Sequence, residues 1–295
     1  GIQVGNAQDL KARTGCTVII CEEGATAGVD VRGGSPGTRE TDLLNPQNAV
    51  DKIHAIILTG GSAFGLDAAS GVMKYLEERN VGFDVQVTKV PIVCGAVLFD
   101  LTVGDYRVRP DLEMGYKACL DASRGRCPNG NIGAGTGATV GKLFGPDRAM
   151  KGGLGSYAIE IGNLQMGAIV AVNCSGDVIN PDTGEILAGL MDEKKEKMIG
   201  TEDALIREYG GNKNIFSGNT TIGAIVTNGK FTKAQANKLA SMAHNGYARA
   251  IRPVHTTFDG DTIFAMATGK VEADVNVVGT LAVKAMERAI VNAVR

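Results

Sequence analysis

Short apolar runs typical of buried strands alternate along the whole chain with longer amphipathic runs typical of helices. Ser62 is a candidate N-cap for the first helical run, and Gly162-Asn163 predicts a hairpin turn between two strands. The expected strands are 16–21, 53–58, 157–161, 166–173, 220–227 and 262–267, and the expected helices are 62–79, 111–123, 233–250 and 275–294. This interleaving predicts an α/β protein with mixed sheets.

Residues 182–217 depart from this alternation. Within them, the charged run 191–198 has no apolar stripe, which predicts a solvated helix or a linker.

The composition excludes several classes of protein. With 44% hydrophobic and 21% charged residues in 295, the chain can bury a large core. Aromatic residues reach 5% and the net charge is −2, so we expect no nucleic-acid partner and no anionic membrane partner. No basic and apolar leader opens the chain, and no apolar run is long enough to span a bilayer. The sequence therefore predicts a cytoplasmic protein.

Motifs for metals, nucleotides and cofactors fail on inspection. The stretch 135–142 resembles a phosphate-binding loop, but Thr136 stands where a glycine is needed and Leu143 where Ser or Thr would hold magnesium. Three histidines share no ligand spacing, and six cysteines form no CxxC pair. We therefore expect no metal and no cofactor.

Thr220 begins a strand directly after the turn residues Gly218 and Asn219. A threonine can act as a nucleophile without histidine when its own α-amine serves as the base, because a free α-amine has a pKa near neutrality. That amine exists only if the chain is cut after Asn219. From residue types alone, an ordinary turn before a strand fits equally well, and so does a turn at Asp259-Gly-Asp261. Asn173 as a strand cap and Lys142 as a surface charge also remain open.

Ordered motifs along nearly the whole chain resemble the DmpA-type family of self-processing N-terminal-nucleophile hydrolases. That family includes aminopeptidases, amidases and the nylon-oligomer (6-aminohexanoate-oligomer) hydrolases. The matching segments are 13–16, 28–34, 58–61 with 65–66, 133–137, 218–228 and 258–264. The last two look most like the nylon-oligomer hydrolase branch.

This resemblance implies a four-layer αββα sandwich, of the DmpA and ornithine acetyltransferase type, in a single hydrolase domain of residues 1–295. Autocleavage would give an α-chain of 1–219, which builds most of the first layer pair, and a β-chain of 220–295. The resemblance also assigns roles: Thr220 as nucleophile, Asn173 as oxyanion donor, and Lys142 as a stabiliser of negative charge. Asp259 and Asp261 would orient the new ammonium group.

The resemblance leaves the substrate class partly open. The aminopeptidase branch uses Ser as nucleophile, has Ser and Glu at the positions of Asp259 and Asp261, and carries a Tyr near Gly141. These departures favour an amidase acting on short peptides or ω-amino amide oligomers over a strict aminopeptidase. The family's oligomers predict a tetramer of processed units. An acyl transferase like the ornithine acetyltransferases, and a binding protein that never processes, are the alternatives.

Overall fold

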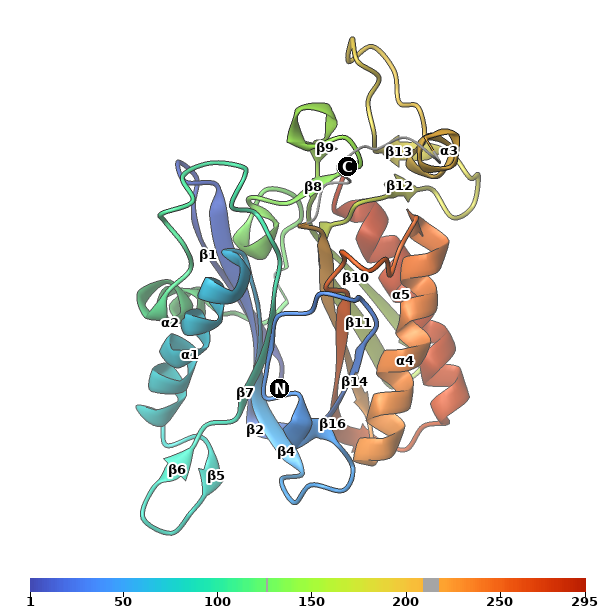
Figure 1. The fold of residues 1–295 in the computed structure, drawn as a ribbon. Coiled ribbons are helices and arrows are strands. Elements are labelled where there is room, and N and C mark those ends of the chain that lie inside the picture. Colours follow the sequence, from blue (N-terminus) through green and yellow to red (C-terminus); the bar gives the residue numbers. More distant parts are fainter. Residues whose placement is uncertain (126, 209–217) are drawn as a thin grey trace.

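The computed structural model describes residues 1–125, 127–208 and 218–295. Figure 1 shows four layers: helices α1 and α2, the two halves of a folded-over sheet, and helices α4 and α5. The helices span Ala68–Glu77 (α1), Leu112–Asp121 (α2), Lys233–Ala250 (α4) and Val275–Asn292 (α5). The expected αββα sandwich is confirmed.

A single nine-stranded sheet supplies both inner layers. Its order is β10-β11-β14-β16-β2-β4-β7-β3, with β1 paired to β2. β2 joins the two halves: its residues 14–20 pair with β1 and its residues 26–31 pair with β16. β14–β16 and β4–β7 are parallel pairs within this otherwise antiparallel sheet. The strands are β1 Gln3–Asp9, β2 Thr14–Val31, β3 Thr38–Arg39, β4 Lys52–Thr59, β7 Val93–Val97, β10 Gly153–Ile161, β11 Leu164–Asn173, β14 Thr220–Gly229 and β16 Thr262–Val271.

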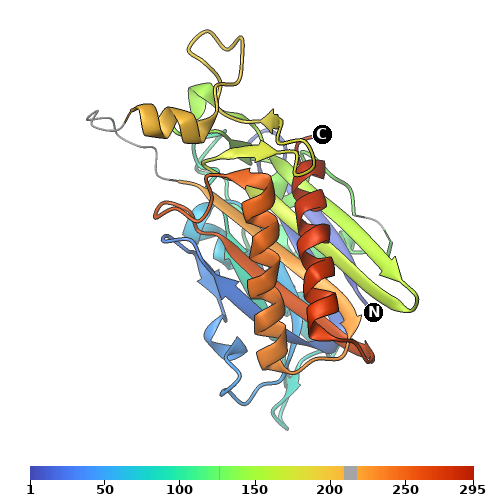
Figure 2. The ribbon, with the colours of Figure 1, turned by 90° about the vertical axis from the view of Figure 1, so that its right-hand side faces the viewer.

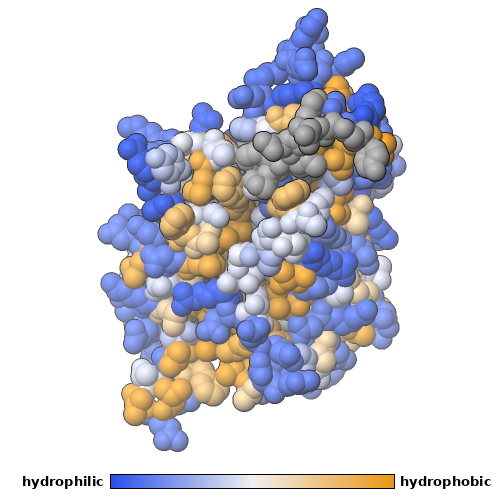
Figure 3. All heavy atoms as spheres, viewed as in Figure 1, coloured by the Kyte–Doolittle hydropathy of each residue, from blue (hydrophilic) through white to orange (hydrophobic). Residues whose placement is uncertain are grey.

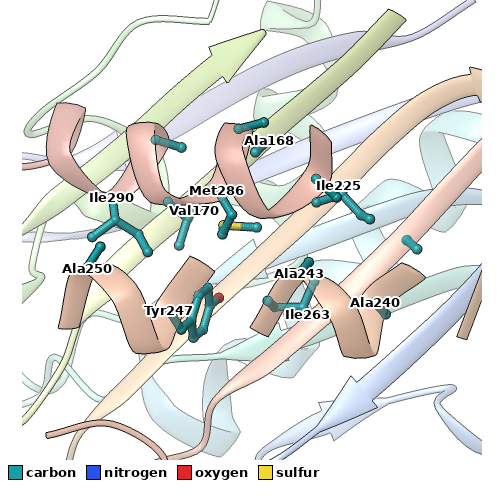
Figure 4. Packing of buried hydrophobic residues seen from close by; sticks show 14 of the residues in the cluster. Ala168, Val170, Ile225, Ala240, Ala243, Tyr247, Ala250, Ile263, Met286 and Ile290 are labelled. Atoms are coloured by element: carbon teal, nitrogen blue, oxygen red, sulfur yellow. The ribbon is translucent and has the colours of Figure 1, made fainter. Parts of the chain in front are cut away.

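Three clusters of hydrophobic side chains fill the spaces between the four layers. Between the sheet halves, Ile19 and Ile56 meet Ile222 and Phe264. β14 serves two clusters because side chains alternate along a strand: Ile222 faces the other half of the sheet, whereas Ile225 packs with α4 and α5. Figure 2 shows α4 and α5 lying side by side across the sheet, and Figure 4 shows the side chains beneath them. The third cluster joins α1 and α2 to β2, β4 and β7.

Short elements lie outside these layers. They are the sheet of β12 Asp177–Ile179, β13 Ile186–Ala188 and β15 Ile251–Arg252, the pairs β5 Phe83–Asp84 with β6 Lys89–Val90 and β8 Thr139–Val140 with β9 Met150–Lys151, and the helix α3 Thr201–Arg207. Apolar side chains gather on the β5–β6 hairpin in Figure 3, where Val87 is 91% exposed. No helix in the described part of the chain has the length and hydropathy needed to cross a bilayer.

The expected helix start at Ser62 needs correction. The helix expected from Ser62 begins as a 3₁₀ turn, Ser62–Asp67, and becomes α-helical only at Ala68; Ser62 has a φ of 54° and provides no side-chain cap. An N-cap residue has an extended backbone, which the left-handed φ of Ser62 does not provide. Gly65 packs closely in this turn, where an added β-carbon would lie 1.9 Å from the Gly60 carbonyl oxygen.

The charged run 191–198 forms no helix, because Met191 and Met198 pair with each other and close the run into a loop. Of the two alternatives for this run, the helix is wrong. Residues 209–217, the end of the stretch that departs from the alternation, lie outside the described residues. The hairpin turn at Gly162-Asn163 is confirmed, since Ile161 pairs with Leu164.

Candidate active site

Thr220 is the first residue of β14, and its side chain is enclosed, with 5% of the residue exposed. The Gly260 N–H donates to the Thr220 hydroxyl oxygen at 3.2 Å and to the Asn219 carbonyl oxygen at 3.1 Å. The Thr220 hydroxyl in turn donates to that same carbonyl oxygen. The hydroxyl therefore lies against the peptide bond that precedes it, and one backbone donor contacts both oxygens.

Asn173, the last residue of β11, lies directly opposite Thr220 in the antiparallel pairing. Its side-chain oxygen accepts the Thr139 N–H at 3.0 Å, and its amide nitrogen donates to the Phe99 carbonyl at 3.0 Å. An amide nitrogen carries two hydrogens, so this bond to Phe99 occupies one of its two donors. The strand register thus brings Asn173 beside Thr220. The two hydrogen bonds fix the orientation of the Asn173 side chain.

Lys142 is a buried lysine, with 1% of the residue exposed. Its ammonium group donates to the Asn173 carbonyl at 2.8 Å and to the Gly218 carbonyl at 3.3 Å. Burial lowers the pKa of Lys142 to about 7, although the charges of Asp259 and Asp261 act in the opposite direction. Lys142 can therefore carry a charge or accept a proton near neutral pH, and it is not a surface charge.

Asp259 and Asp261 are buried in the loop before β16, and Asn219 pairs with Asp259 through an isolated β-bridge. Asp259 Oδ2 accepts two hydrogen bonds from Thr256, one from the N–H and one from the hydroxyl, at 2.8 and 2.6 Å. Among the described residues, Asp259 Oδ1 is buried without a hydrogen-bond partner. Burial, and then the neighbouring charge of Asp261, raise the pKa of Asp259 to about 6. The site thus contains a carboxylate oxygen that lacks a donor.

Asp261 is fully buried, and both of its oxygens accept hydrogen bonds. Oδ1 accepts the N–H of Thr221, the residue after Thr220, at 2.8 Å. Oδ2 accepts the backbone N–H of His255 at 3.0 Å and lies 2.9 Å from its ring Nδ1. Asp261 therefore ties the start of β14 to the loop before β16.

The six residues predicted for the site lie together in this one buried region. They are Asn219, Thr220, Asn173, Lys142, Asp259 and Asp261. Gly33 supports it by packing against the loop before β16, where its added β-carbon would lie 2.2 Å from the Asp259 carbonyl oxygen. A side chain at position 33 would displace that loop. The glycine-rich segment 28–34 therefore has a packing role beside the site.

Sequence reasoning missed Asp100, which is buried next to Phe99. Its carboxylate accepts the Thr14 hydroxyl and the Gly61 N–H, both at 2.7 Å, and Gly137 packs against its side chain. Burial raises the pKa of this carboxyl. Three segments of the family-like pattern, 13–16, 58–61 and 133–137, thus meet at one aspartate that lies outside all of them. His255 was also missed; the one available signal was its place six residues before Asp261.

The sequence profile of peptidase family S58 matches residues 1–295, the whole chain. The chain belongs to peptidase family S58. An uncharacterized aminopeptidase of Mycobacterium leprae (strain TN) is 43% identical over 291 residues, which cover 92% of this chain and 78% of that protein. The 6-aminohexanoate-oligomer endohydrolase of Kocuria sp. (strain KY2) is 33% identical over 276 residues, covering 92% and 74%.

A solved structure extends the family comparison to the fold. The L-aminopeptidase D-Ala-esterase/amidase of Ochrobactrum anthropi, described as a new variant of the Ntn hydrolase fold, superposes with a TM-score of 0.75. The two chains are 19% identical, and the match covers 99% of this chain and 83% of that one. This S58 chain therefore has the Ntn-type sandwich and is a peptide or amide hydrolase.

Proposed function

We propose that this chain is a self-processing amide hydrolase whose nucleophile is Thr220, freed as a new N-terminus by cleavage after Asn219. One observation carries the proposal: the Thr220 hydroxyl lies against the carbonyl of the bond to be cut, among Lys142, Asn173, Asp259 and Asp261. An ordinary turn before a strand has no need of two buried carboxylates and a buried lysine, because each costs free energy to desolvate.

Self-cleavage begins when the Thr220 oxygen attacks the Asn219 carbonyl carbon and passes its proton to neutral Lys142. The Gly260 N–H, which already donates to this carbonyl oxygen, stabilises the developing oxyanion. The carbon–nitrogen bond then breaks, the nitrogen takes the proton from Lys142, and Asn219 remains attached to the Thr220 oxygen as an ester. Water hydrolyses the ester, which leaves the Asn219 carboxylate and a free Thr220 amine.

The unpaired oxygen of Asp259 fits the product of this cleavage. Asp259 Oδ1 lacks a donor among the described residues, and a new ammonium group at Thr220 would supply one beside it. Asp261 would hold the adjacent N–H of Thr221 so that the strand start keeps its position. In its neutral form the amine then takes the Thr220 proton during attack on a substrate amide. The amide of Asn173 stabilises the resulting oxyanion.

Residues 1–219 and 220–295 would remain one hydrolase domain after cleavage. β14 pairs with β11 of the first fragment, and β16 pairs with β2, also of the first fragment. We expect the processed units to assemble into a tetramer in the cytoplasm.

Short peptides and ω-amino amide oligomers are the proposed substrates. Relatives of this chain are named both as aminopeptidases and as 6-aminohexanoate-oligomer endohydrolases. The segments 218–228 and 258–264, which contain Thr220, Asp259 and Asp261, resemble the nylon-oligomer hydrolase branch, and this resemblance favours an amidase.

An activity assay tests this function. Purified protein should release amine from short peptide amides and from 6-aminohexanoate oligomers, and Thr220→Ala should release none above background. Thr220→Ser, which keeps a hydroxyl, should retain part of the activity. Amide hydrolysis by Thr220→Ala at the wild-type rate would exclude Thr220 as the nucleophile.

A further inference from the structure

His255 lies next to the proposed machinery but has no role in it so far. Its ring Nδ1 lies 2.9 Å from Asp261 Oδ2, and its own backbone N–H donates to the same oxygen at 3.0 Å. The other oxygen of Asp261 accepts the Thr221 N–H. A continuous path of hydrogen bonds therefore runs from the His255 ring through one buried carboxylate to the residue after Thr220.

The packing of the His255 ring fixes which nitrogen faces Asp261. His244 of α4 packs edge-on against it with ring centroids 4.8 Å apart, and the Tyr247 ring is stacked at 6.0 Å. His244 is itself anchored, because its Nε2 lies 2.9 Å from the Asp30 carbonyl oxygen. The side chain of His255 is 18% exposed, so the ring has little space in which to turn.

The bond to a carboxylate requires a hydrogen on Nδ1 of His255. Among the described residues, the opposite nitrogen, Nε2, is buried without a hydrogen-bond partner. A histidine kept only for its packing would gain nothing from this arrangement, and an apolar ring would avoid burying a polar atom without a partner. The Nδ1 donor is the group that accounts for a histidine at this position.

We propose that His255 is a positioning residue that orients Asp261, and through Asp261 holds the Thr221 N–H and the nucleophile at the start of β14. This inference rests on the function proposed above. Without the ring donor, Oδ2 keeps only the backbone bond, and the carboxylate can rotate away from Thr221. Self-cleavage and turnover should both slow, with kcat reduced and KM unchanged, because substrate contacts are not altered.

Substitutions at His255 can separate the side-chain donor from the backbone. His255 has a φ of 59°, which glycine and asparagine accept readily. His255→Gly removes the ring and keeps the backbone donor. His255→Asn restores an N–H attached to the same γ-carbon position as Nδ1. His255→Leu has the branched shape of the Asn variant but offers Asp261 no donor and no charge.

The test follows cleavage after Asn219 by intact mass over time, together with kcat and KM for a short amide. We expect His255→Gly and His255→Leu to slow cleavage and lower kcat by about tenfold to a hundredfold. His255→Asn should stay within about threefold of wild type. His54→Asn is the matched control, because His54 of β4 is also buried but its ring Nδ1 accepts the Ile92 N–H and does not contact Asp261. It should leave the cleavage rate unchanged.

Each outcome decides a different question. Wild-type rates in His255→Gly, or equal slowing in His255→Asn and His255→Leu, would overturn the positioning role while leaving Thr220 as nucleophile. Thermal unfolding of each variant identifies any loss caused by misfolding, and the comparison of the Asn variant with the Leu variant decides the matter if the Gly variant is unstable. A wild-type chain that is never cut after Asn219 would overturn the proposed function and this inference together.

Discussion

Gly260 packs so closely against Thr220 that an added β-carbon would lie 2.8 Å from the Thr220 hydroxyl oxygen. The same β-carbon would lie 2.8 Å from the Ser35 carbonyl oxygen, so it could not move aside freely. We therefore expect Gly260→Ala to slow cleavage after Asn219 by about a hundredfold or more, since small displacements of reacting groups have effects of this size. Intact mass against time measures the rate.

Gly167→Ala is the control for this substitution. Gly167 lies in β11 of the same sheet, and an added β-carbon there would meet nothing within 4 Å. It should cleave at the wild-type rate. Equal rates for Gly260→Ala and Gly167→Ala would show that the contact with Thr220 has no bearing on the chemistry.

The carboxyl of Asp259 predicts a pH-dependent change in stability. Its pKa is about 6 in the folded protein and 3.8 in the unfolded chain, so the folded state binds the proton more tightly. The associated stabilisation is present below pH 4 and is lost as the pH rises through 6. An Asp259→Asn variant has no ionisable group at this position, so it does not lose this stabilisation as the pH rises. In the uncut Thr220→Ala background, Asp259→Asn should therefore gain about 1–3 kcal/mol relative to its parent between pH 4 and pH 7.

Urea unfolding at the two pH values measures this difference. Comparing the same pair of proteins at both values cancels constant effects of the substitution, such as a new unpaired amide. A difference that stays constant with pH, or that changes in the opposite direction, would contradict the burial of an ionisable Asp259.

Individual site residues were predictable only through their motifs. Residue types alone left Thr220 as a strand start and Lys142 as a surface charge, because neither burial nor the strand register is visible in a local stretch of sequence. Asp100 and His255 show the limit more clearly. Asp100 contacts Thr14 and Gly61, and His255 contacts α4. These partners are distant in the sequence, so no local pattern specifies the contacts.

At the scale of elements, β2 and α4 are in close contact at Gly28. An added β-carbon there would lie 2.2 Å from the backbone nitrogen of Asn237 in α4. Gly28→Ala should push the helix away from the strand and destabilise the uncut protein by about 1–3 kcal/mol, the usual cost of overpacking. Denaturant unfolding of Gly28→Ala, with Gly167→Ala as the control, checks the prediction. Equal free energies of unfolding for the two variants would show that the contact between α4 and Gly28 does not limit the size of this residue.

The helices with strong end signals were the most predictable elements. α4 has the predicted bounds, because Thr232 and Gln235 form a capping box at its start. The Asp274 side chain caps the start of α5 by accepting two backbone N–H groups. The expected strand 157–161 is shorter than β10. The first residues of β10, 153–156, lack an alternating pattern, and they form a strand only because they pair with β11. Local signals fix helix ends well, whereas strand ends depend on the neighbouring strand.

At the scale of the whole molecule, the two predicted fragments are interleaved in one sheet. β14 and β16 of residues 220–295 lie between β11 and β2 of residues 1–219, and α5 packs on β10 and β11. The fragments should therefore elute together in gel filtration after cleavage and separate only in denaturant. Separation in native buffer would contradict this arrangement.

The order of the strands in the sheet could not be obtained from periodicity. β2 lies in both halves of the sheet because of a register shift between Ile20 and Ala25, and its predicted strand covered only residues 16–21. Only the resemblance to a family supplied the four layers, since pairing between distant strands leaves no local trace.

Intact-mass analysis of the purified protein, with Thr220→Ala prepared alongside, decides whether the chain cuts itself with Thr220. We expect two fragments in the wild type, residues 1–219 and 220–295, and a single uncut chain in Thr220→Ala. A wild-type chain that stays whole, a cut at another bond, or a Thr220→Ala chain cut after Asn219 would contradict this expectation.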